Sequence, residues 1–338
     1  MKRHGYLFDK ICSFENLLIA SKKAQKGKRF KTSTGLFNLE LENELIILRE
    51  QLQNQTYRMG EYKQFYIHDP KKRLISAAPY RDRVVQHALC NVIEPLFDRT
   101  FIDDSYACRK DKGSHKAVDR FTEFSRKNAY VLKCDIKSYF ASIEHDALCR
   151  LILKKIKDPQ ALRLIKLIID STPSPGIPIG NLTSQIFANL YLGGLDHYLK
   201  EDVKCKYYIR YMDDLIIFDN DKSRLNKWKE LIREYLRSLK LKLHENKCQV
   251  FPTRKGVDFL GYKIYPTHRL VIKDNIRRLR KRLKKYFMLF LEGGITGDKI
   301  ICSMQSWLGY ALYADSYNLR RRLLMRYDFQ ACLPAGRG

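Results

Sequence analysis

Hydrophobic residues recur at helical spacing through most of residues 1–60. Leu41, Leu45 and Leu48 lie four and three residues apart, with charged residues between them, which is the pattern of a helix with one buried face. Lysine and arginine crowd the segment 22–31, and such a run of like charges is typical of a solvated, mobile loop. We therefore expect an N-terminal helical region that is interrupted by a basic loop.

The next segments alternate between strand and helix patterns. Residues 62–77 form strand-like pieces around a turn signal at Asp69–Lys72, and helical spacing returns over 84–97. The β-rich run 130–136 carries one acid near its end, Asp135. We expect this run to be a buried strand.

The middle of the chain contains further helices. Helical patterns cover 143–169, and the prolines and glycines of 172–180 predict a loop before a helix that begins near Thr183. A long helix is expected over 226–239, followed by short strands as far as Tyr265.

From about residue 270 the pattern becomes that of a helical segment with a basic exterior. An apolar stripe is formed by Ile276, Leu279, Leu283, Phe287 and Phe290. Seven lysines and arginines between 277 and 285 cover the other faces of this helix. From residue 270 to the end, 14 Lys and Arg stand against 5 Asp and Glu, a net charge of +9.

The composition indicates a polyanionic partner. The 338 residues are 45% hydrophobic and 12% aromatic, which is enough to bury a core and excludes a wholly disordered chain. The formal net charge of +27 favours binding to nucleic acid or to an anionic membrane surface. No apolar run approaches the roughly 18 residues that span a bilayer, and the N-terminus lacks the apolar core of a signal peptide. We therefore expect a cytoplasmic protein that binds nucleic acid and has no membrane partner.

The nine cysteines are scattered along the chain and form no CxxC pair. A zinc site or a disulfide framework would need clustered cysteines. We expect mostly buried, free thiols in a reducing compartment.

Three acids lie within apolar surroundings. Asp135 closes a predicted strand, and Asp213 and Asp214 lie between the apolar runs 207–211 and 215–218, which is the signature of a hairpin. Carboxylates that are buried together repel each other unless cations lie between them, and Mg²⁺ prefers oxygen ligands of this kind. Two such ions can activate an attacking hydroxyl and stabilise a leaving pyrophosphate. The alternative is that Asp213 and Asp214 are ordinary turn residues.

Two motifs resemble the palm of reverse transcriptases. Tyr211-Met212-Asp213-Asp214 reads YMDD, the sequence that marks this palm, and Lys133–Phe140 resembles its first motif, an acid followed five residues later by an aromatic residue. The resemblance implies an α+β, right-hand polymerase fold, in which an antiparallel palm sheet packs on helices. It also implies the substrates of such an enzyme: dNTPs, a template RNA and the RNA/cDNA duplex.

The resemblance assigns roles to residues of both motifs. Two Mg²⁺ ions, with Mn²⁺ as a substitute, would be held by Asp135, Ile136, Asp213 and Asp214. Ile136 and Phe140 would also contact the nucleotide. Phe140 would be the steric gate, whose ring fills the space that a ribose 2′-hydroxyl needs.

Basic residues outside the palm extend the resemblance. Pro79–Leu89 looks like the fingers motif of bacterial reverse transcriptases, in which cations hold the incoming triphosphate. Arg73 and Arg81 are the candidates for this role, because guanidinium groups can bind phosphate oxygens in pairs; surface salt bridges are the alternative. Lys247, in a segment that resembles the motif after the YMDD hairpin, would protonate the departing pyrophosphate, unless it is an ordinary exposed lysine.

The remaining motifs concern the primer and the duplex. Phe259-Leu260-Gly261-Tyr262 looks like the turn that grips the primer end, where glycine permits a close backbone approach. The basic segment from 270 would be the thumb, which follows the duplex through its phosphates. The implied division of the chain is an N-terminal helical extension with its basic loop at 1–60, mainly fingers at 61–130, mainly palm at 131–265, a helical thumb at 266–330 and a disordered tail at 331–338.

The segment before the helix near Thr183 suggests a particular group of these enzymes. Gly180–Gln185 has the form GxxxSQ, which resembles the reverse transcriptases of diversity-generating retroelements, as does Ser306–Tyr310. In that group, copying of a template-repeat RNA misincorporates opposite adenine, and the cDNA diversifies a target gene. Ile179 and Gln185 are candidates for an influence on fidelity, with Gln185 also contacting the nucleotide; plain packing at the start of the helix is the alternative. The group also implies a small, basic, pentameric accessory protein and a bacterial, archaeal or phage origin.

Three other functions fit parts of the pattern. A reverse transcriptase of a retron or of a phage-defence system would share the catalytic residues. A splicing maturase would also bind RNA, but we would expect further C-terminal domains. A catalytically inactive RNA-binding protein would keep the charge, although Asp135, Asp213, Asp214 and Phe140 are all present.

Overall fold

The computed structural model describes residues 3–68 and 72–326. Most of the predicted turn at 69–72 and the predicted tail at 331–338 lie outside the described residues. The chain forms two compact units and passes between them several times. The first unit comprises Met1–Asp111, Cys134–Leu215 and Lys227–Cys248, and the second comprises Lys112–Lys133, Ile216–Asn226 and Gln249–Gly338.

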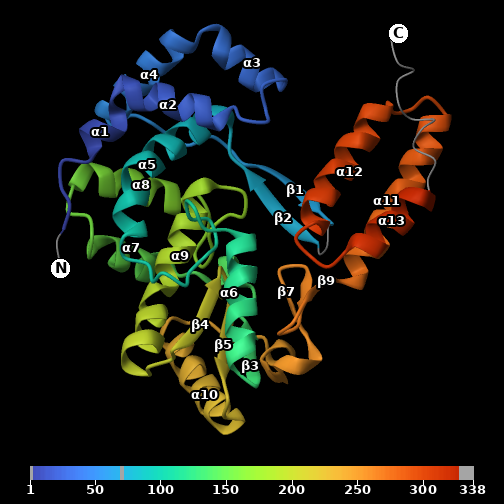
Figure 1. Cartoon of the computed structure of the whole chain (residues 1–338). Coiled ribbons are helices and arrows are strands. Elements are labelled where there is room, and N and C mark those ends of the chain that lie inside the picture. The colour runs from blue at the N-terminus through green and yellow to red at the C-terminus, as the bar shows by residue number, and fades with distance from the viewer. Residues whose placement is uncertain (1–2, 69–71, 327–338) are drawn as a thin grey trace. The chain divides into compact units, whose positions relative to one another are not determined.

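Helices build the N-terminal part of the first unit (Figure 1). They are α1 (Phe8–Cys12), α2 (Phe14–Ala24), α3 (Thr32–Leu39), α4 (Leu41–Gln53) and α5 (Tyr80–Asp98). The predicted basic loop is wrong at its start, because Lys22 and Lys23 belong to the last turn of α2. Cations are favourable at this end of a helix, and buried Ser21 and Ala24 continue its packed face.

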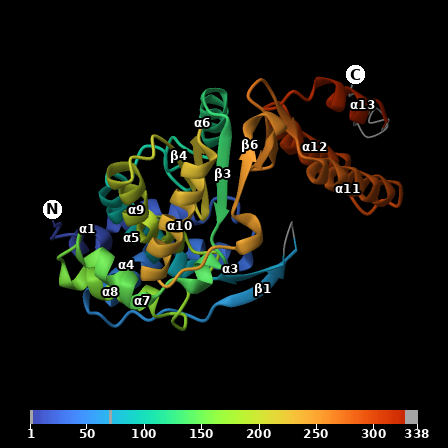
Figure 2. The same cartoon turned by 90° about the horizontal axis from the view of Figure 1, so that it is seen from below.

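The rest of the first unit confirms the predicted helices and the loop between them. The helices are α7 (His145–Leu153), α8 (Pro159–Ile169) and α9 (Leu182–His197), and α9 continues into a short π-helical turn, η2 (Tyr198–Asp202). The antiparallel hairpin of β1 (Lys63–Ile67) and β2 (Arg73–Ala77) pairs Lys63 with Ala77. It extends away from the helices of its own unit (Figure 2).

A four-stranded sheet carries the predicted acids. Its strands are β3 (Tyr130–Asp135), β4 (Tyr207–Tyr211), β5 (Asp214–Asp219) and β6 (Gln249–Pro252), and their order is β4-β5-β3-β6. β3 pairs with β6 in antiparallel register. The β4–β5 hairpin confirms the prediction, and α10 (Lys222–Ser238) begins four residues before the predicted start. Helices and antiparallel strands together confirm the α+β fold class.

The second unit contains a helix that the sequence analysis did not predict, α6 (Ser114–Lys127). Ala117, Val118, Phe121 and Phe124 are buried at three- and four-residue spacing, so the signal was present. The Phe121 ring stacks on Phe259 at 5.1 Å. A short turn, η4 (Thr253–Lys255), leads into the three-stranded sheet of β7 (Val257–Phe259), β8 (Tyr262–Ile264) and β9 (Arg269–Val271).

The C-terminal helices have their own core. They are α11 (Lys273–Leu291), α12 (Gly297–Ala311) and α13 (Tyr317–Arg326), and α11 runs beside α12 (Figures 1 and 2). Leu279 and Leu283 of the predicted stripe are buried there with Trp307, and Ile276 and Phe290 pack against them. Within the described ranges, no helix is long and apolar enough to cross a membrane.

Candidate functional site

The turn of the β4–β5 hairpin lies beside the end of β3. Met212 and Asp213 form the turn, with Met212 in the left-handed region at φ +54°, and Asp214 is the first residue of β5. The backbone N–H of Ile136 donates to the carbonyl oxygen of Asp213 at 3.3 Å. The structure therefore brings Asp135 and Asp213 together from segments that are far apart in the sequence.

Asp135 and Asp213 together form an acidic site, and the positive charges of nearby residues act on it. Burial raises the pKa of the Asp213 carboxyl, and the nearby charge of Asp135 raises it further. Arg73 and Lys247 act in the opposite direction and lower this pKa. Arg73, which is exposed at the start of β2, thus lies close enough to act on the acidic site.

Lys247 neutralises Asp135. It ends the short turn η3 (Glu245–Lys247), and its Nζ donates to Oδ2 of Asp135 at 2.6 Å. In the part of the chain that the structure describes, no three His, Cys, Asp or Glu side chains are grouped closely enough to hold a metal ion. The expected cluster of Asp135, Asp213 and Asp214 is therefore not formed by the side chains in these positions.

The donor chemistry nevertheless fits a divalent cation. Carboxylate oxygens are preferred ligands of Mg²⁺, and the raised pKa of Asp213 is the signature of a buried acid that lacks enough positive charge. The ammonium of Lys247 supplies such charge to Asp135.

Phe140 follows β3 on a tight turn. Ser138 adopts φ +49°, and the 3₁₀ turn η1 (Tyr139–Ser142) begins after it. The phenol of Tyr139 is anchored by donating to the carbonyl of Ala188. Phe140 is half-buried, with its ring at 67° to that of Tyr139.

The loop before α9 joins this turn to the β1–β2 hairpin. The N–H of Ile177 donates to the carbonyl of Phe140 at 2.8 Å, and the N–H of Ser76 donates to the carbonyl of Ile179 at 2.9 Å. Gly180 has φ +129°, and a Cβ there would lie 2.8 Å from the carbonyl oxygen of Ser76. Gly180 is therefore required by the close approach of the loop to β2. Gln185 is half-buried in the first turns of α9.

Arg81 has other partners than the acidic residues. Its guanidinium donates to Oε1 of Gln51 and lies 5.2 Å from the centre of the Tyr57 ring. The structure does not bring Arg81 to Asp135 or Asp213, so its role in binding the triphosphate stays a prediction.

The side chains that hold the YMDD turn in place were not predicted from the sequence. Arg210 and Asp196 form an ion pair at 2.7 Å in which both side chains have 0% exposure. Nη1 of Arg210 also donates to the carbonyl of Met212 at 3.3 Å and to Oδ1 of Asn189 at 2.9 Å. Because Asn189 and Asp196 belong to α9, Arg210 fastens the turn to this helix. An arginine inside an apolar strand was the available signal.

The predicted primer-grip turn belongs to the second unit. Leu260 and Gly261 adopt φ +47° and +89° between β7 and β8. A Cβ on Gly261 would lie 2.5 Å from the phenol oxygen of Tyr310, and this phenol donates to the carbonyl of Gly261. The close approach that glycine permits here is thus made by α12 of the same chain, and contact with a primer stays a prediction.

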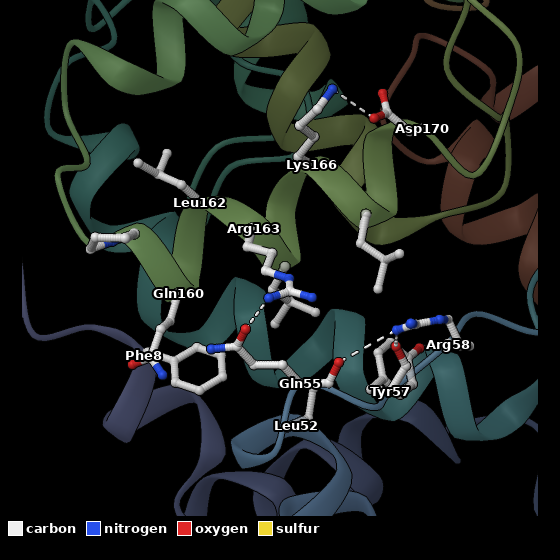
Figure 3. A pocket seen from close by; sticks show the side chains of 13 residues that line it. Phe8, Leu52, Gln55, Tyr57, Arg58, Gln160, Leu162, Arg163, Lys166 and Asp170 are labelled. Carbon is white, nitrogen blue, oxygen red and sulfur yellow. Dashed lines mark hydrogen bonds and ion pairs between the residues drawn. The ribbon is translucent and has the colours of Figure 1, made fainter.

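The first unit also contains an apolar hollow of about 560 Å³ (Figure 3). Phe8, Leu52 and Tyr57 line it together with residues of α8. Arg163 donates to Gln55 across one side, and Lys166 pairs with Asp170 at 2.7 Å. None of the predicted catalytic residues lines this hollow.

The free thiols agree with the sequence analysis. Eight cysteines lie in the described ranges, and all are free. Five of these eight are buried.

Comparison with known proteins places this site in a family. The model of the family "Reverse transcriptase (RNA-dependent DNA polymerase)" matches residues 67–264. The protein YkfC of Escherichia coli (strain K12) is 26% identical in an alignment of 270 positions that covers 65% of this chain and 71% of YkfC. The group II intron-encoded protein LtrA of Lactococcus lactis subsp. cremoris is 26% identical over 199 residues, 55% of this chain and 33% of LtrA. Apo telomerase from Candida tropicalis is similar in structure with a TM-score of 0.49 at 13% identity, over 62% of this chain and 48% of the telomerase chain.

The chain thus spans most of YkfC, a third of LtrA and about half of the telomerase chain. The family model covers more than half of the 338 residues. Its range contains Arg73, Asp135, the YMDD turn, Lys247 and the turn at Gly261. The chain therefore belongs to the reverse transcriptase family and carries its RNA-directed DNA polymerase domain.

Proposed function

We propose that this protein copies a template-repeat RNA into cDNA, with misincorporation opposite adenine, for the diversification of a target gene. The observation that carries this proposal is the GxxxSQ segment Gly180–Gln185 and its setting. The loop that precedes it is hydrogen-bonded to Phe140 on one side and to β2 on the other. A change in this loop can therefore shift the candidate gate residue without altering the acidic residues.

The proposed reaction transfers a nucleotidyl group. The primer 3′-oxygen forms a bond to the α-phosphorus of the dNTP, and the bond from this phosphorus to the bridging oxygen breaks. The electron pair leaves with pyrophosphate, and the 3′-hydroxyl proton passes to solvent. Mg²⁺, when bound, would activate the 3′-hydroxyl and neutralise the pyrophosphate.

Separate residues of this chain would bind the metal ions and donate the proton. Asp135, Asp213 and Asp214 would hold the ions, with Mn²⁺ as a substitute, and Ile136 would contribute beside them. Lys247, which lies at Asp135, would deliver a proton to the leaving pyrophosphate.

Further residues would bind the substrates. Arg73 would bind the triphosphate from the hairpin. Phe140 would exclude the ribose 2′-hydroxyl, and Gln185 would contact the nascent base pair. Phe259, Leu260 and Gly261 would meet the primer end, and the exposed cations of α11 would follow the duplex.

A small basic accessory protein and a cytoplasmic location complete the proposal.

The test is primer extension on an RNA template with Mg²⁺ and dNTPs, followed by sequencing of the cDNA. Errors concentrated opposite adenine are expected. Accurate cDNA would overturn the diversifying role and keep the polymerase.

A second candidate function is that of an intron, retron or phage-defence reverse transcriptase. The name of the relative LtrA, a group II intron-encoded protein, favours the intron type. Accurate copying together with promotion of splicing of a cognate intron RNA would support it. Tight RNA binding without synthesis, even with the accessory protein, would leave only the inactive RNA-binding protein.

A further inference from the structure

A basic hollow of about 650 Å³ lies in the first unit beside the acidic site. This volume is that of a small-molecule pocket rather than of a groove for a duplex. The end of α10 and the segment 240–246 form most of its wall, and Lys137 completes it. Its basic side chains are Lys137, Arg233, Arg237, Lys240, Lys242 and His244, and its single acid is Glu245.

Among residues 3–68 and 72–326, only two of these six basic side chains have an acidic partner. Arg233 pairs with Glu230 and with Glu245, and Lys240 pairs with Glu144 at 3.3 Å. The side chains of Lys137, Arg237 and Lys242 make no hydrogen bond or ion pair with any residue of 3–68 or 72–326. The single acid of the hollow is thus already engaged, and positive charge remains uncompensated.

The helix dipole explains only part of this charge. α10 ends at Ser238, and cations are favourable at the negative end of a helix. This accounts for Arg237 and Lys240. It does not account for Lys137 and Lys242, which follow β3 and the end of α10 on separate segments.

The wall of the hollow is hydrogen-bonded to the strand that carries Asp135. The N–H of His244 donates to the carbonyl of Asp135 at 2.8 Å, and the N–H of Lys137 donates to the carbonyl of Lys242 at 2.8 Å. The same segment ends in Lys247, whose ammonium contacts Asp135. The segments that carry the unpaired cations Lys137 and Lys242 are therefore bonded directly to the end of the strand that carries Asp135.

We propose that this hollow binds the di- or triphosphate group of the polymerase reaction, either in the pyrophosphate that leaves or in the dNTP that enters. Several cations around one small hollow match a compact polyphosphate, and a guanidinium such as that of Arg237 binds phosphate oxygens in pairs. The inference rests on the proposed polymerase function for the source of the anion, but binding can be measured without catalysis.

The experiment titrates the full-length protein with inorganic pyrophosphate in a calorimeter, without divalent metal. The variant is the double substitution Arg237→Gln and Lys242→Gln, and the matched control is Lys227→Gln, an exposed cation of α10 that does not line the hollow. We expect the Kd for pyrophosphate to rise roughly fivefold to tenfold in the double variant, as for the loss of two exposed charge contacts. It should stay within twofold in Lys227→Gln. The charge-preserving pair Arg237→Lys and Lys242→Arg should recover most of the affinity, which separates lost charge from misfolding.

Primer extension then identifies the source of the anion. A raised inhibition constant for pyrophosphate in the double variant assigns the hollow to the leaving group, and a raised KM for dTTP assigns it to the incoming nucleotide. An unchanged Kd for pyrophosphate overturns the proposal, and so does a double variant that loses only RNA affinity. If the parent protein makes no cDNA but binds pyrophosphate through Arg237 and Lys242, the site stands and the proposed function fails.

Discussion

Nζ of Lys247 lies 2.6 Å from Oδ2 of Asp135, although 112 residues separate them in the chain. The pair joins the residue that we propose as the proton donor to a residue that we propose as a metal ligand. Occupation of the acidic site by a divalent cation would compete with Lys247 for this carboxylate. The lysine would then be free to turn toward the leaving pyrophosphate.

Lys247→Gln should lower kcat about 10²-fold, the usual contribution of a positioned general acid, and leave the KM for dNTP within threefold. The measurement is steady-state primer extension across pH. The basic limb of the rate profile should disappear in Lys247→Gln and also in Lys247→Arg, because arginine keeps its proton across the accessible pH range. An unchanged profile in Lys247→Gln would remove Lys247 from proton transfer and leave it only a partner of Asp135.

Asp213→Asn should abolish synthesis, by at least about 10²-fold, and stabilise the metal-free protein at neutral pH. The folded-state pKa of Asp213 is raised, chiefly by burial. The folded state therefore loses stability as pH rises through this pKa and the buried carboxyl ionises. Asparagine carries no such charge, so the gain should be present at pH 7 and vanish in acid. Thermal unfolding at pH 7 and in acid tests this prediction, and Glu234→Gln, which removes an exposed carboxylate, is the control. Equal melting temperatures of the parent and Asp213→Asn at pH 7 would contradict it.

Arg210→Met should cost about 3–5 kcal/mol of unfolding free energy, because it leaves the fully buried Asp196 without its partner. The double variant Arg210→Met and Asp196→Leu should recover part of this stability but little synthesis. The reason is that the Met212 carbonyl still lacks its donor. Denaturant unfolding and primer extension, measured on the same preparations, separate the two effects. Full recovery of synthesis would show that Arg210 only stabilises the fold.

Phe140→Ala should admit ribonucleotides by removing the half-buried ring of the proposed gate, which lies on the turn that follows β3. The selectivity for dTTP over UTP, measured as a ratio of kcat/KM, should fall at least about tenfold, as for the loss of one steric contact. Tyr139→Phe is the control, because it keeps both rings and removes only the hydrogen bond to Ala188. Equal sugar selectivity in Phe140→Ala and the parent would rule out the gate.

His87→Gln should protect the protein against mild acid. Burial, together with the nearby positive charges of Lys23, Lys28 and Arg83, lowers the pKa of His87 to about 4. Between its ordinary value of 6.5 and about 4, the unfolded state binds a proton that the folded state does not, so stability falls as pH falls through this window. Because His87 is partly exposed, we expect this effect to lower the free energy of unfolding by roughly 1–2 kcal/mol. Urea unfolding at pH 7 and pH 5 should give a smaller loss for His87→Gln than for the parent; an equal loss would refute the assignment.

Local pattern alone was sufficient for several elements of this protein. The hairpin around Asp213 and Asp214, the strand that ends at Asp135 and the stripe of α11 were all predicted, because each depends on neighbours within a few residues. The motifs in these elements also identified the family. α6 was not predicted, although its apolar residues have helical spacing. The predicted basic loop began too early in the sequence, because the run of positive charge was given more weight than the helical pattern of α2.

Long-range contacts needed the tertiary structure. Periodicity carries no information on which distant segments meet, so it could not pair Lys247 with Asp135, bury Arg210 against Asp196 or direct Arg81 toward Gln51. Each of these contacts forms only when separate elements meet: η3 and β3, β4 and α9, and α5 and α4. The order of the amino acids is sufficient for the chemistry of the side chains and for the local elements that present them. Which charges compensate one another follows only from the folded structure, because that depends on burial and on distances across the fold.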